Sequence, residues 1–210
     1  MKPNRHIKQV VVLLLFMMWS QVSFAQSDDW KLVREDEGIN VFSRIGENSS
    51  IKEIRITCSV RSSMEHMETF LSEVPKYADW VYKCDTSVLL SRISSKEIIY
   101  YITLNFPFPM TDRDLVIHSV HSIDSLGVYR SHSAASTEYP SESSDFIRIS
   151  QFESTWEITP QSDGTLYIDY FAHSDPGGDI PAWLINMAID QGPYHTMKQF
   201  IEQLEKGSVE

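Results

Sequence analysis

Two pairs of side chains in the segment 112 to 121 have types and spacing that could support chemistry. Two histidines could bind a metal ion, but a spacing of three on a β-strand sends His118 and His121 to opposite faces. Asp112 and Asp114 share a strand face, as the paired carboxylates of an acid–base site would. Because Arg113 lies between them at the entrance of a strand, we favour solvated ion pairing for both carboxylates. We therefore predict neither a metal site nor a catalytic dyad here.

A single charged residue stands out in the segment "FIRISQF". If one strand runs through 146 to 159, its alternation places Arg148 on the same face as Phe146, Phe152 and Trp156. A charge in such an apolar row is costly unless a carboxylate or a polar ligand group meets it. Two interpretations stay open: a buried ion pair that holds the sheet, or an anchor for the headgroup or carboxylate of a ligand.

The common catalytic and cofactor motifs are missing from the chain. GxSxG, HExxH, GxxxxGK[ST] and GxGxxG do not occur, and each would supply a defined geometry for a nucleophile, a metal or a phosphate. The polar side chains left to serve an apolar pocket are Arg148, Tyr101, Ser119, Ser150 and His121. Their spacing defines no nucleophile–base pair, so we predict no catalytic residue and no cofactor.

The elements that must position these residues follow from the hydrophobic periodicity. An acidic, weakly helical lead follows Trp30, and then alternating apolar residues predict strands at 39–45 and 51–60. Helical spacing follows at 61–74, with Ser62 or Ser63 as N-cap, and a short helix at 75–83. Period-two segments then predict an antiparallel meander, with strands at 86–93, 97–106, 114–123, 128–136, 146–159 and 165–174.

The C-terminal part returns to helical spacing. An apolar stripe runs from Leu184 to Leu204 and predicts one long helix of more than twenty residues, kinked at Gly192 and Pro193. Two strands, two helices, a meander and a final helix define an α+β fold with that helix packed across a curved antiparallel sheet.

The first twenty-five residues have the pattern of a secretory signal peptide. Three basic residues precede the apolar run Val10 to Trp19, and Ser23 to Ala25 offers a small-x-small cleavage site. The apolar run is too short for a membrane span, which needs about 20 residues. We therefore expect residues 1–25 to be removed and residues 26–210 to form a single exported domain, periplasmic or extracellular.

Charge narrows the range of partners. Without the leader the chain keeps 15 of its 18 Lys and Arg residues and all 29 Asp and Glu residues, a formal charge near −14. Such a surface repels phosphate backbones and anionic lipid headgroups. We expect a monomer with no nucleic-acid partner, and any membrane contact would be transient, local and apolar.

The two cysteines allow two interpretations in an oxidising compartment. Cys58 and Cys84 could form one disulfide, because their number is even. Cys58 also lies on the apolar side of its strand, so two small buried thiols are the alternative. Neither residue belongs to a zinc-binding pattern.

Several ordered motifs together resemble the START lipid-transfer domains. The three main stretches are "FPFPMTDRDLV" (106–116), "FIRI" (146–149) and "DPGGDIPAWLINMA" (175–188). "GINVFSR" (38–44) and "YADW" (77–80) are similar to the same family, and the resemblance covers about residues 29 to 206.

The resemblance implies a helix-grip fold whose curved sheet wraps the C-terminal helix and encloses a tunnel for one lipid or sterol-like molecule. The sequences of these motifs are most similar to those of the phosphatidylcholine-transfer type, in which the choline group of the ligand sits in an aromatic cage beside an Arg/Asp pair. Tyr77 and Val81 stand at the Arg/Asp positions, Ile102 and Leu115 replace two cage aromatics, and only Phe152 keeps an aromatic ring. Without a cage there is little cation–π attraction, so we do not expect phosphatidylcholine specificity.

The same matching implies a tunnel wall, to which we add a residue of the C-terminal helix. The expected ligand-binding residues are Ile102, Leu104, Leu115, Ile117, Arg148, Phe152 and Met187. Burying about 16 acyl carbons at roughly 0.8 kcal/mol each gives on the order of 12 kcal/mol, enough for aliphatic walls to hold a lipid. The expected function is non-enzymatic binding, transfer or sensing of a hydrophobic ligand. The alternatives are a helix-grip enzyme, similar to cyclases or hydrolases, and an empty scaffold for a protein partner.

Overall fold

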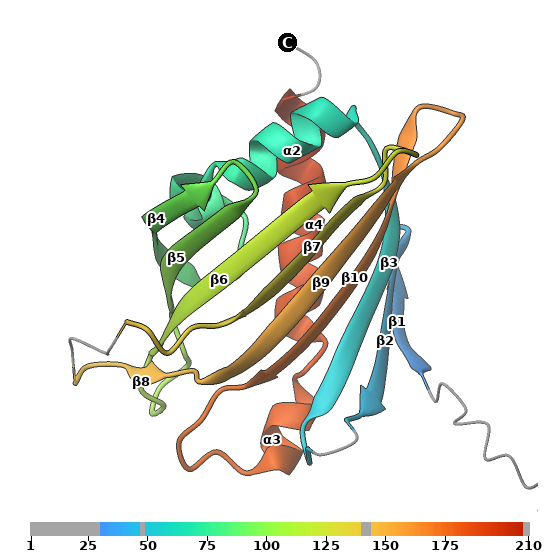
Figure 1. The fold of residues 1–210 in the computed structure, drawn as a ribbon. Helices are drawn as coiled ribbons and strands as arrows, with labels where there is room; N and C mark the ends of the chain where they lie inside the picture. The colour runs from blue at the N-terminus through green and yellow to red at the C-terminus, as the bar shows by residue number, and fades with distance from the viewer. Residues whose placement is uncertain (1–29, 47–48, 140–143, 208–210) are drawn as a thin grey trace, which may run out of the picture.

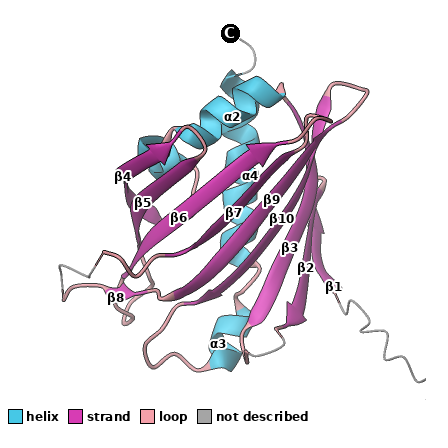
Figure 2. Ribbon diagram, in the orientation of Figure 1, coloured by secondary structure: helices cyan, strands magenta, loops and turns pink. Residues whose placement is uncertain are grey.

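The computed structural model describes residues 30–46, 49–139 and 144–207 (Figure 1). The expected leader, residues 1–25, lies outside these ranges. In them, the sheet curves around α4 (Gln191–Gly207), while α2 (Met64–Ser72) crosses one end and α3 (Ala182–Met187) lies near the other (Figure 2). None of the helices in these ranges combines the length and apolar character that a membrane-spanning segment requires. The α+β class with an antiparallel sheet and a C-terminal helix is confirmed.

The N-terminal strands are β1 (Lys31–Asp36), β2 (Ile39–Ile45) and β3 (Lys52–Arg61). The expectation of a weak helix before β2 was wrong. Glu37 and Gly38 both have positive φ, 49° and 78°, and join Asp36 to its partner Ile39. Two central residues with positive φ make the turn that matches the twist of a β-hairpin, so residues 31–36 fold back on β2 as a strand.

The helices between β3 and the meander agree with the prediction. Ser63 is the N-cap of α2, because its hydroxyl accepts a hydrogen bond from the His66 amide at 3.1 Å. Met67 is the buried residue of α2. A 3-10 helix, η1 (Val74–Asp79), follows with Pro75 in its first turn, where the missing amide costs no helical hydrogen bond.

The remaining elements form the meander and the C-terminal helices. The strands are β4 (Cys84–Ser94), β5 (Glu97–Leu104), β6 (Arg113–Ile123), β7 (Tyr129–Ala135), β8 (Ile147–Arg148), β9 (Gln151–Pro160) and β10 (Thr165–Asp175). The described strands lie in the order β1-β2-β3-β10-β9-β7-β6-β5-β4, each antiparallel to its neighbours. The short β8 pairs with β6 in parallel, off this path.

The predicted strand 146–159 is two strands. β8 places Ile147 beside Arg113 and Arg148 beside Asp114 of β6, and the chain then leaves this pairing at Ile149 and Ser150. β9 begins at Gln151 and pairs with β7 and β10 instead. The break shifts the side-chain parity, so an alternation counted from Phe152 no longer predicts where Arg148 points.

The predicted long C-terminal helix is also divided. α3 ends at Met187, the chain turns through 188–190, and α4 begins at Gln191. Pro193 therefore lies in the first turn of α4, where proline is tolerated, and kinks nothing. α4 buries Tyr194, Met197, Phe200 and Leu204 against the sheet. The Phe200 ring lies 5.2 Å from Trp156 of β9 and 5.3 Å from Trp80, so α4 is held by aromatic contacts on two sides.

Candidate functional site

An internal cavity of about 290 Å³ separates the sheet from α2 and the N-terminal half of α4. Small side chains on the sheet explain why this space stays open. Ser119 of β6, Ser133 of β7, Ser154 of β9 and Ala172 of β10 are successive cross-strand neighbours, and all four line the cavity. Neighbours paired across antiparallel strands point to the same face, so the row leaves a strip of the sheet without bulky side chains.

One end of the cavity is apolar. Five of the seven residues expected on the tunnel wall line it, namely Ile102, Leu104, Leu115, Ile117 and Phe152. Ile149, which the sequence did not single out, completes this end and is only 3% exposed. The structure thus brings these side chains together around one space, and their contact with a ligand stays a prediction.

Arg148 does not line the cavity. Its Nε and Nη2 donate to the two carboxylate oxygens of Asp114 at 2.9 and 2.8 Å, and Nη1 donates to the Tyr139 carbonyl at 2.7 Å. The bidentate hydrogen bonds from this guanidinium to Asp114 raise the pKa of Arg148. Of the two interpretations left open by the sequence, the geometry supports the ion pair that holds the sheet.

Met187 also lies away from the cavity. It is the last residue of α3, is 68% exposed and does not line the cavity. The structure therefore differs from the predicted wall at Met187 as it does at Arg148.

The charged corner 112–114 is a buried connection between loops. Arg113 is 1% exposed and donates to the carbonyls of Pro176 at 3.0 Å, Gly177 at 3.1 Å and Thr111. Asp112 accepts from the Phe106 amide at 2.7 Å, whereas Asp114 faces Arg148. The expected solvated ion pairing is wrong, since Arg113 and Asp114 are buried, and the two aspartates form no acid–base pair.

The buried tyrosines of the cavity stay protonated. Burial raises the pKa of Tyr77 and Tyr100 well above the usual range for a phenol, and raises that of Tyr129 and Tyr170 to about 12. The hydroxyls of three of these tyrosines form hydrogen bonds. Tyr77 donates to the Leu71 carbonyl at 2.6 Å, and Tyr129 and Tyr170 bond to serine hydroxyls. They offer polar hydroxyls to a ligand but no phenolate base.

The opposite end of the cavity, beneath α2, is polar. His121 lines it, is stacked on Tyr129, and has its Nε2 3.4 Å from a carboxylate oxygen of Glu68 without hydrogen-bond geometry. Arg92 of β4 lines this end as well. His118 instead bonds to Glu97 at 2.8 Å and does not line the cavity, as expected from strand parity. In the described part of the chain no three His, Cys, Asp or Glu side chains cluster as a metal site.

Sequence reasoning missed Arg92, Glu68 and Trp80 at this end. Trp80 is 5% exposed, lines the cavity, and its indole Nε1 has no hydrogen-bond partner. A signal for Arg92 existed in the cross-strand register, but the irregular pairing of β4 with β5 between Leu89 and Ser94 hid it from simple alternation. The two cysteines are separate thiols, Cys58 in the core and Cys84 donating to the Thr86 carbonyl.

The sequence of this chain is similar to a protein family and to individual proteins. The START domain model matches residues 21–207. The human phosphatidylcholine transfer protein is 29% identical over 181 residues, which cover 81% of each chain. An uncharacterised protein of Pseudomonas aeruginosa is 27% identical over 182 residues, 87% of this chain and 90% of the relative.

Solved structures share the same arrangement. A STAR-related lipid transfer protein from Xanthomonas axonopodis superposes with a TM-score of 0.78 at 26% identity, covering 84% of this chain and 99% of the other. Human STARD10 superposes with a TM-score of 0.74 over 98% of this chain and 81% of its own. At 17% identity, the second likeness concerns the fold alone.

Proposed function

This chain belongs to the START domain family, and on that premise we propose that it binds one hydrophobic, lipid-like molecule in the cavity beneath α4 and transfers or senses it without catalysis. The observation that carries the proposal is the lined space itself. A row of small residues keeps about 290 Å³ open in an otherwise packed interior, and aliphatic side chains form one end of it. A packed core has few voids larger than a water molecule, so a lined space of this size is the best candidate for a ligand-binding site.

The similarity to lipid transfer proteins supports a lipid as the ligand but does not identify which lipid. Tyr77, Ile102 and Leu115 occupy positions where the family resemblance implies an arginine and two cage aromatics in the choline-binding type. Tyr77 packs edge-on against Trp80 and Tyr100, with ring centroids 5.0 and 5.3 Å apart, and so fills space in the core. We therefore do not extend phosphatidylcholine specificity to this chain.

The alternative of an enzyme in the same cavity gains no specific support. Ser133 donates to Ser119 at 2.9 Å, and Ser131 bonds to Tyr129. In the described ranges no serine hydroxyl hydrogen-bonds to His121, the general base such a site would need.

The proposal is tested by what the protein carries. Native mass spectrometry after mild purification is expected to find a bound mass that disappears on denaturation, and the emptied protein is expected to take up fluorescent lipids. Failure of both measurements would contradict the proposal. Turnover of the extracted molecule, abolished by His121→Ala in a folded protein, would support the enzyme instead.

We further propose that the protein is exported and touches membranes transiently through one apolar end. Phe108, Trp183 and Met187 are 97%, 68% and 68% exposed. Arg113 joins the loop before β6, which contains Phe108, to the loop before α3, and that loop and α3 lie at the same end of the molecule (Figure 1). Aromatic and apolar side chains can insert into the lipid interface of a neutral membrane even though acidic residues outnumber basic ones in this chain.

Membrane contact is tested with neutral phosphatidylcholine vesicles. Trp183→Ser is expected to lower the vesicle-bound fraction in flotation by about tenfold, because it removes a large apolar side chain from the interface. Leu126→Ser is the matched control, since Leu126 is 80% exposed in the turn between β6 and β7, away from α3. An equal loss in both variants, or in neither, would contradict the proposed end.

A further inference from the structure

The polar end of the cavity belongs to a continuous row across the sheet. Arg92 of β4 pairs with Ile98 of β5, Ile98 with Ser119 of β6, and Ser119 with Ser133 of β7. Each of these residues lines the cavity. Because cross-strand partners point to the same face, Arg92 stands at the edge of the cavity face, at the end of the hydroxyl row.

Arg92 is exposed, and its guanidinium has no carboxylate partner among the residues that the structure describes. Arg34, Arg55 and Arg148 pair with Asp190, Asp169 and Asp114. No hydrogen bond or ion pair engages Arg92 in the described ranges, and it is the one arginine there that lines the cavity. In a chain with 29 acidic and 18 basic residues, a cation left open beside a cavity is a place for an anionic group from outside the chain.

The other charged groups at this end leave that place open. The carboxylate of Glu68 lies beside His121 at 3.4 Å, so its nearest basic partner is the imidazole. His121 pairs across strands with Ser131, whose hydroxyl bonds to Tyr129. Within the described ranges, the buried Nε2 of His121 makes no hydrogen bond, and neither does the buried Nε1 of Trp80. Unpaired buried groups of this kind are costly and gain from an acceptor.

Polarity changes along the cavity. Arg92, His121 and Ser119 lie toward α2, whereas Leu104, Leu115, Ile149 and Phe152 lie at the far end, as their positions along β5, β6 and β9 require. The volume of about 290 Å³ lies at the bottom of the range of roughly 300–1,000 Å³ found for small-molecule pockets. This space suits one slim chain rather than two acyl chains and a glycerol.

We propose that the ligand is a single-chain amphiphile with a terminal carboxylate, of the long-chain fatty acid class. Its acid group lies at Arg92 and the hydroxyls of Ser119 and Ser133, and its tail runs toward Phe152 and Ile149. This inference rests on the proposed function, since it names the ligand class of the same cavity.

The test compares ligands that differ only in the head group. Displacement of a bound fluorescent fatty acid is measured with dodecanoic acid, dodecan-1-ol and the matching twelve-carbon lysophosphatidylcholine, near pH 7, where the acid is ionised. The wild-type protein is expected to bind the acid about tenfold more tightly than the alcohol, because a charge-assisted hydrogen bond is lost with the alcohol.

Three variants test whether the preference for the acid over the alcohol depends on Arg92. Arg92→Gln is expected to bind the acid about tenfold more weakly and the alcohol unchanged, whereas Arg92→Lys keeps most of the preference. Arg61→Gln, an exposed arginine of β3 that does not line the cavity, controls for net charge and leaves all affinities unchanged.

Two outcomes would overturn the inference while the proposed function stands. One is equal affinity for acid and alcohol in the wild type, or an Arg92→Gln variant that keeps the preference. The other is stronger competition by lysophosphatidylcholine than by the acid, which would point to a choline group at this end. Absence of binding by every apolar probe would instead contradict the proposed function itself.

Discussion

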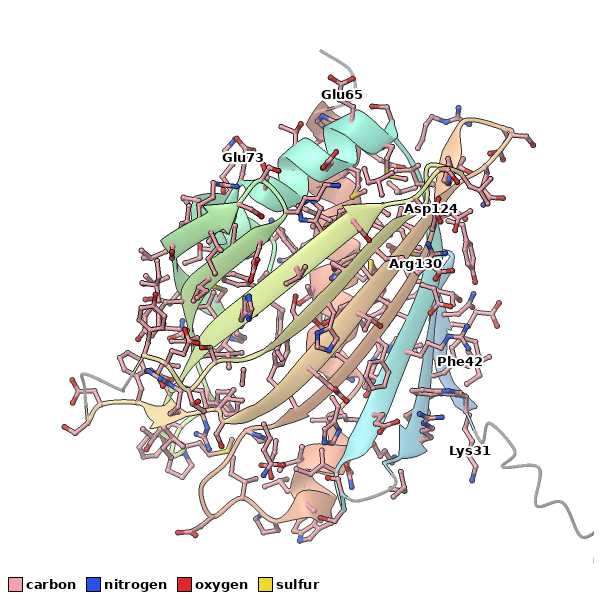
Figure 3. All side chains as sticks on the ribbon, viewed as in Figure 1. Lys31, Phe42, Glu65, Glu73, Asp124 and Arg130 are labelled. Atoms are coloured by element: carbon pink, nitrogen blue, oxygen red, sulfur yellow. The ribbon has the colours of Figure 1, made fainter. Side chains whose placement is uncertain are left out.

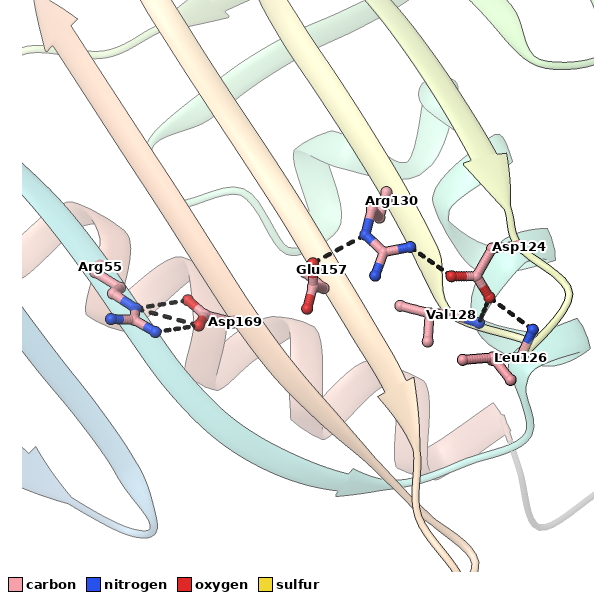
Figure 4. A network of polar contacts seen from close by, with 7 residues as sticks. All are labelled: Arg55, Asp124, Leu126, Val128, Arg130, Glu157 and Asp169. Carbon is pink, nitrogen blue, oxygen red and sulfur yellow. Dashed lines mark hydrogen bonds and ion pairs between the residues drawn. The ribbon is translucent and has the colours of Figure 1, made fainter.

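The two faces of the same sheet have opposite chemistry. The outer face has cross-strand ion pairs, such as Arg55 with Asp169 at 2.5 Å and Arg130 with Glu157 at 2.9 Å (Figure 4). Arg130 also reaches Asp124 at 2.6 Å in the turn after β6, and both residues are labelled on the outside of the ribbon in Figure 3. The inner face has aliphatic side chains, aromatic rings and serine hydroxyls around the cavity.

Ion pairs on the outer face of this sheet therefore contribute little to stability, whereas the interior pair matters much more. Exposed pairs gain about 0–1 kcal/mol each and mainly keep the surface polar. The interior pair of Arg148 and Asp114 has side chains only 20% and 3% exposed, so neither partner can be lost without leaving a desolvated charge. Removing an arginine or an aspartate is therefore expected to lower the free energy of unfolding by different amounts on the two sides. Substitutions can measure this difference.

The largest effect is expected for the interior pair. Asp114→Ala leaves the Tyr139 carbonyl as the hydrogen-bond acceptor of Arg148 among the described residues, and is expected to lower the free energy of unfolding by about 3–5 kcal/mol. Denaturant titration followed by tryptophan fluorescence measures it. Asp114→Asn, which keeps the shape, is the matched control and should lose less. A loss below about 1 kcal/mol would make this pair equivalent to those outside.

A functional effect with little change in stability is expected on the inner face of β7. Ser133→Leu places a bulky side chain in the cavity and is expected to reduce uptake of fluorescent lipid at least about tenfold, because it fills the ligand volume. The free energy of unfolding should change by only about 1 kcal/mol, since the lost Ser133–Ser119 hydrogen bond is offset by apolar burial.

The neighbouring position on the same strand separates the two faces. His132 is exposed, and His132→Leu is expected to leave lipid uptake unchanged. If both variants bind lipid equally well, the ligand does not occupy the space beside Ser133, and the contrast between the faces would not extend to function.

The smallest effect is expected for an outer pair. Arg55→Ala removes the partner of Asp169 on β10 and is expected to cost about 0–1 kcal/mol of unfolding free energy, because the side chains are 39% and 25% exposed and solvent screens them. Thermal unfolding with the double variant Arg55→Ala, Asp169→Ala completes a cycle for the pair. A coupling energy above about 2 kcal/mol would contradict the expectation that ion pairs on the outer face contribute little to stability.

Much of the fold could be predicted from the sequence because the hydrophobic periods are strong and local. Alternation located the strands of the meander, and Ser63 was correctly among the expected N-caps. The errors fall where nonlocal pairing decides. Residues 31–36 become a strand through the Glu37–Gly38 turn, and residues 146–159 split because β8 and β9 pair with different partners.

The apolar lining of the cavity could be predicted from the sequence, whereas its polar lining could not. Ile102, Leu104, Leu115 and Ile117 lie on regular strands, where parity holds over the whole element. Arg92 lines the cavity and Arg148 does not, and they lie beside a register shift and a strand break, where parity does not predict which side chain faces the cavity. No single-sequence pattern reports which acid an arginine will meet across 34 residues, as Arg148 meets Asp114.

The strand order has a consequence for how the chain folds as it is made. β3 is complete at Arg61, yet the strand that covers its free edge is β10, which begins at Thr165. Until then β3 is an edge strand without a partner on that side, and one of its faces, formed by Ile54, Ile56, Cys58 and Val60, is apolar. The sheet, and with it the cavity, can therefore close only when the last quarter of the described sequence has been made. The sequence distance between β3 and β10 therefore sets how long this edge stays unpaired during synthesis.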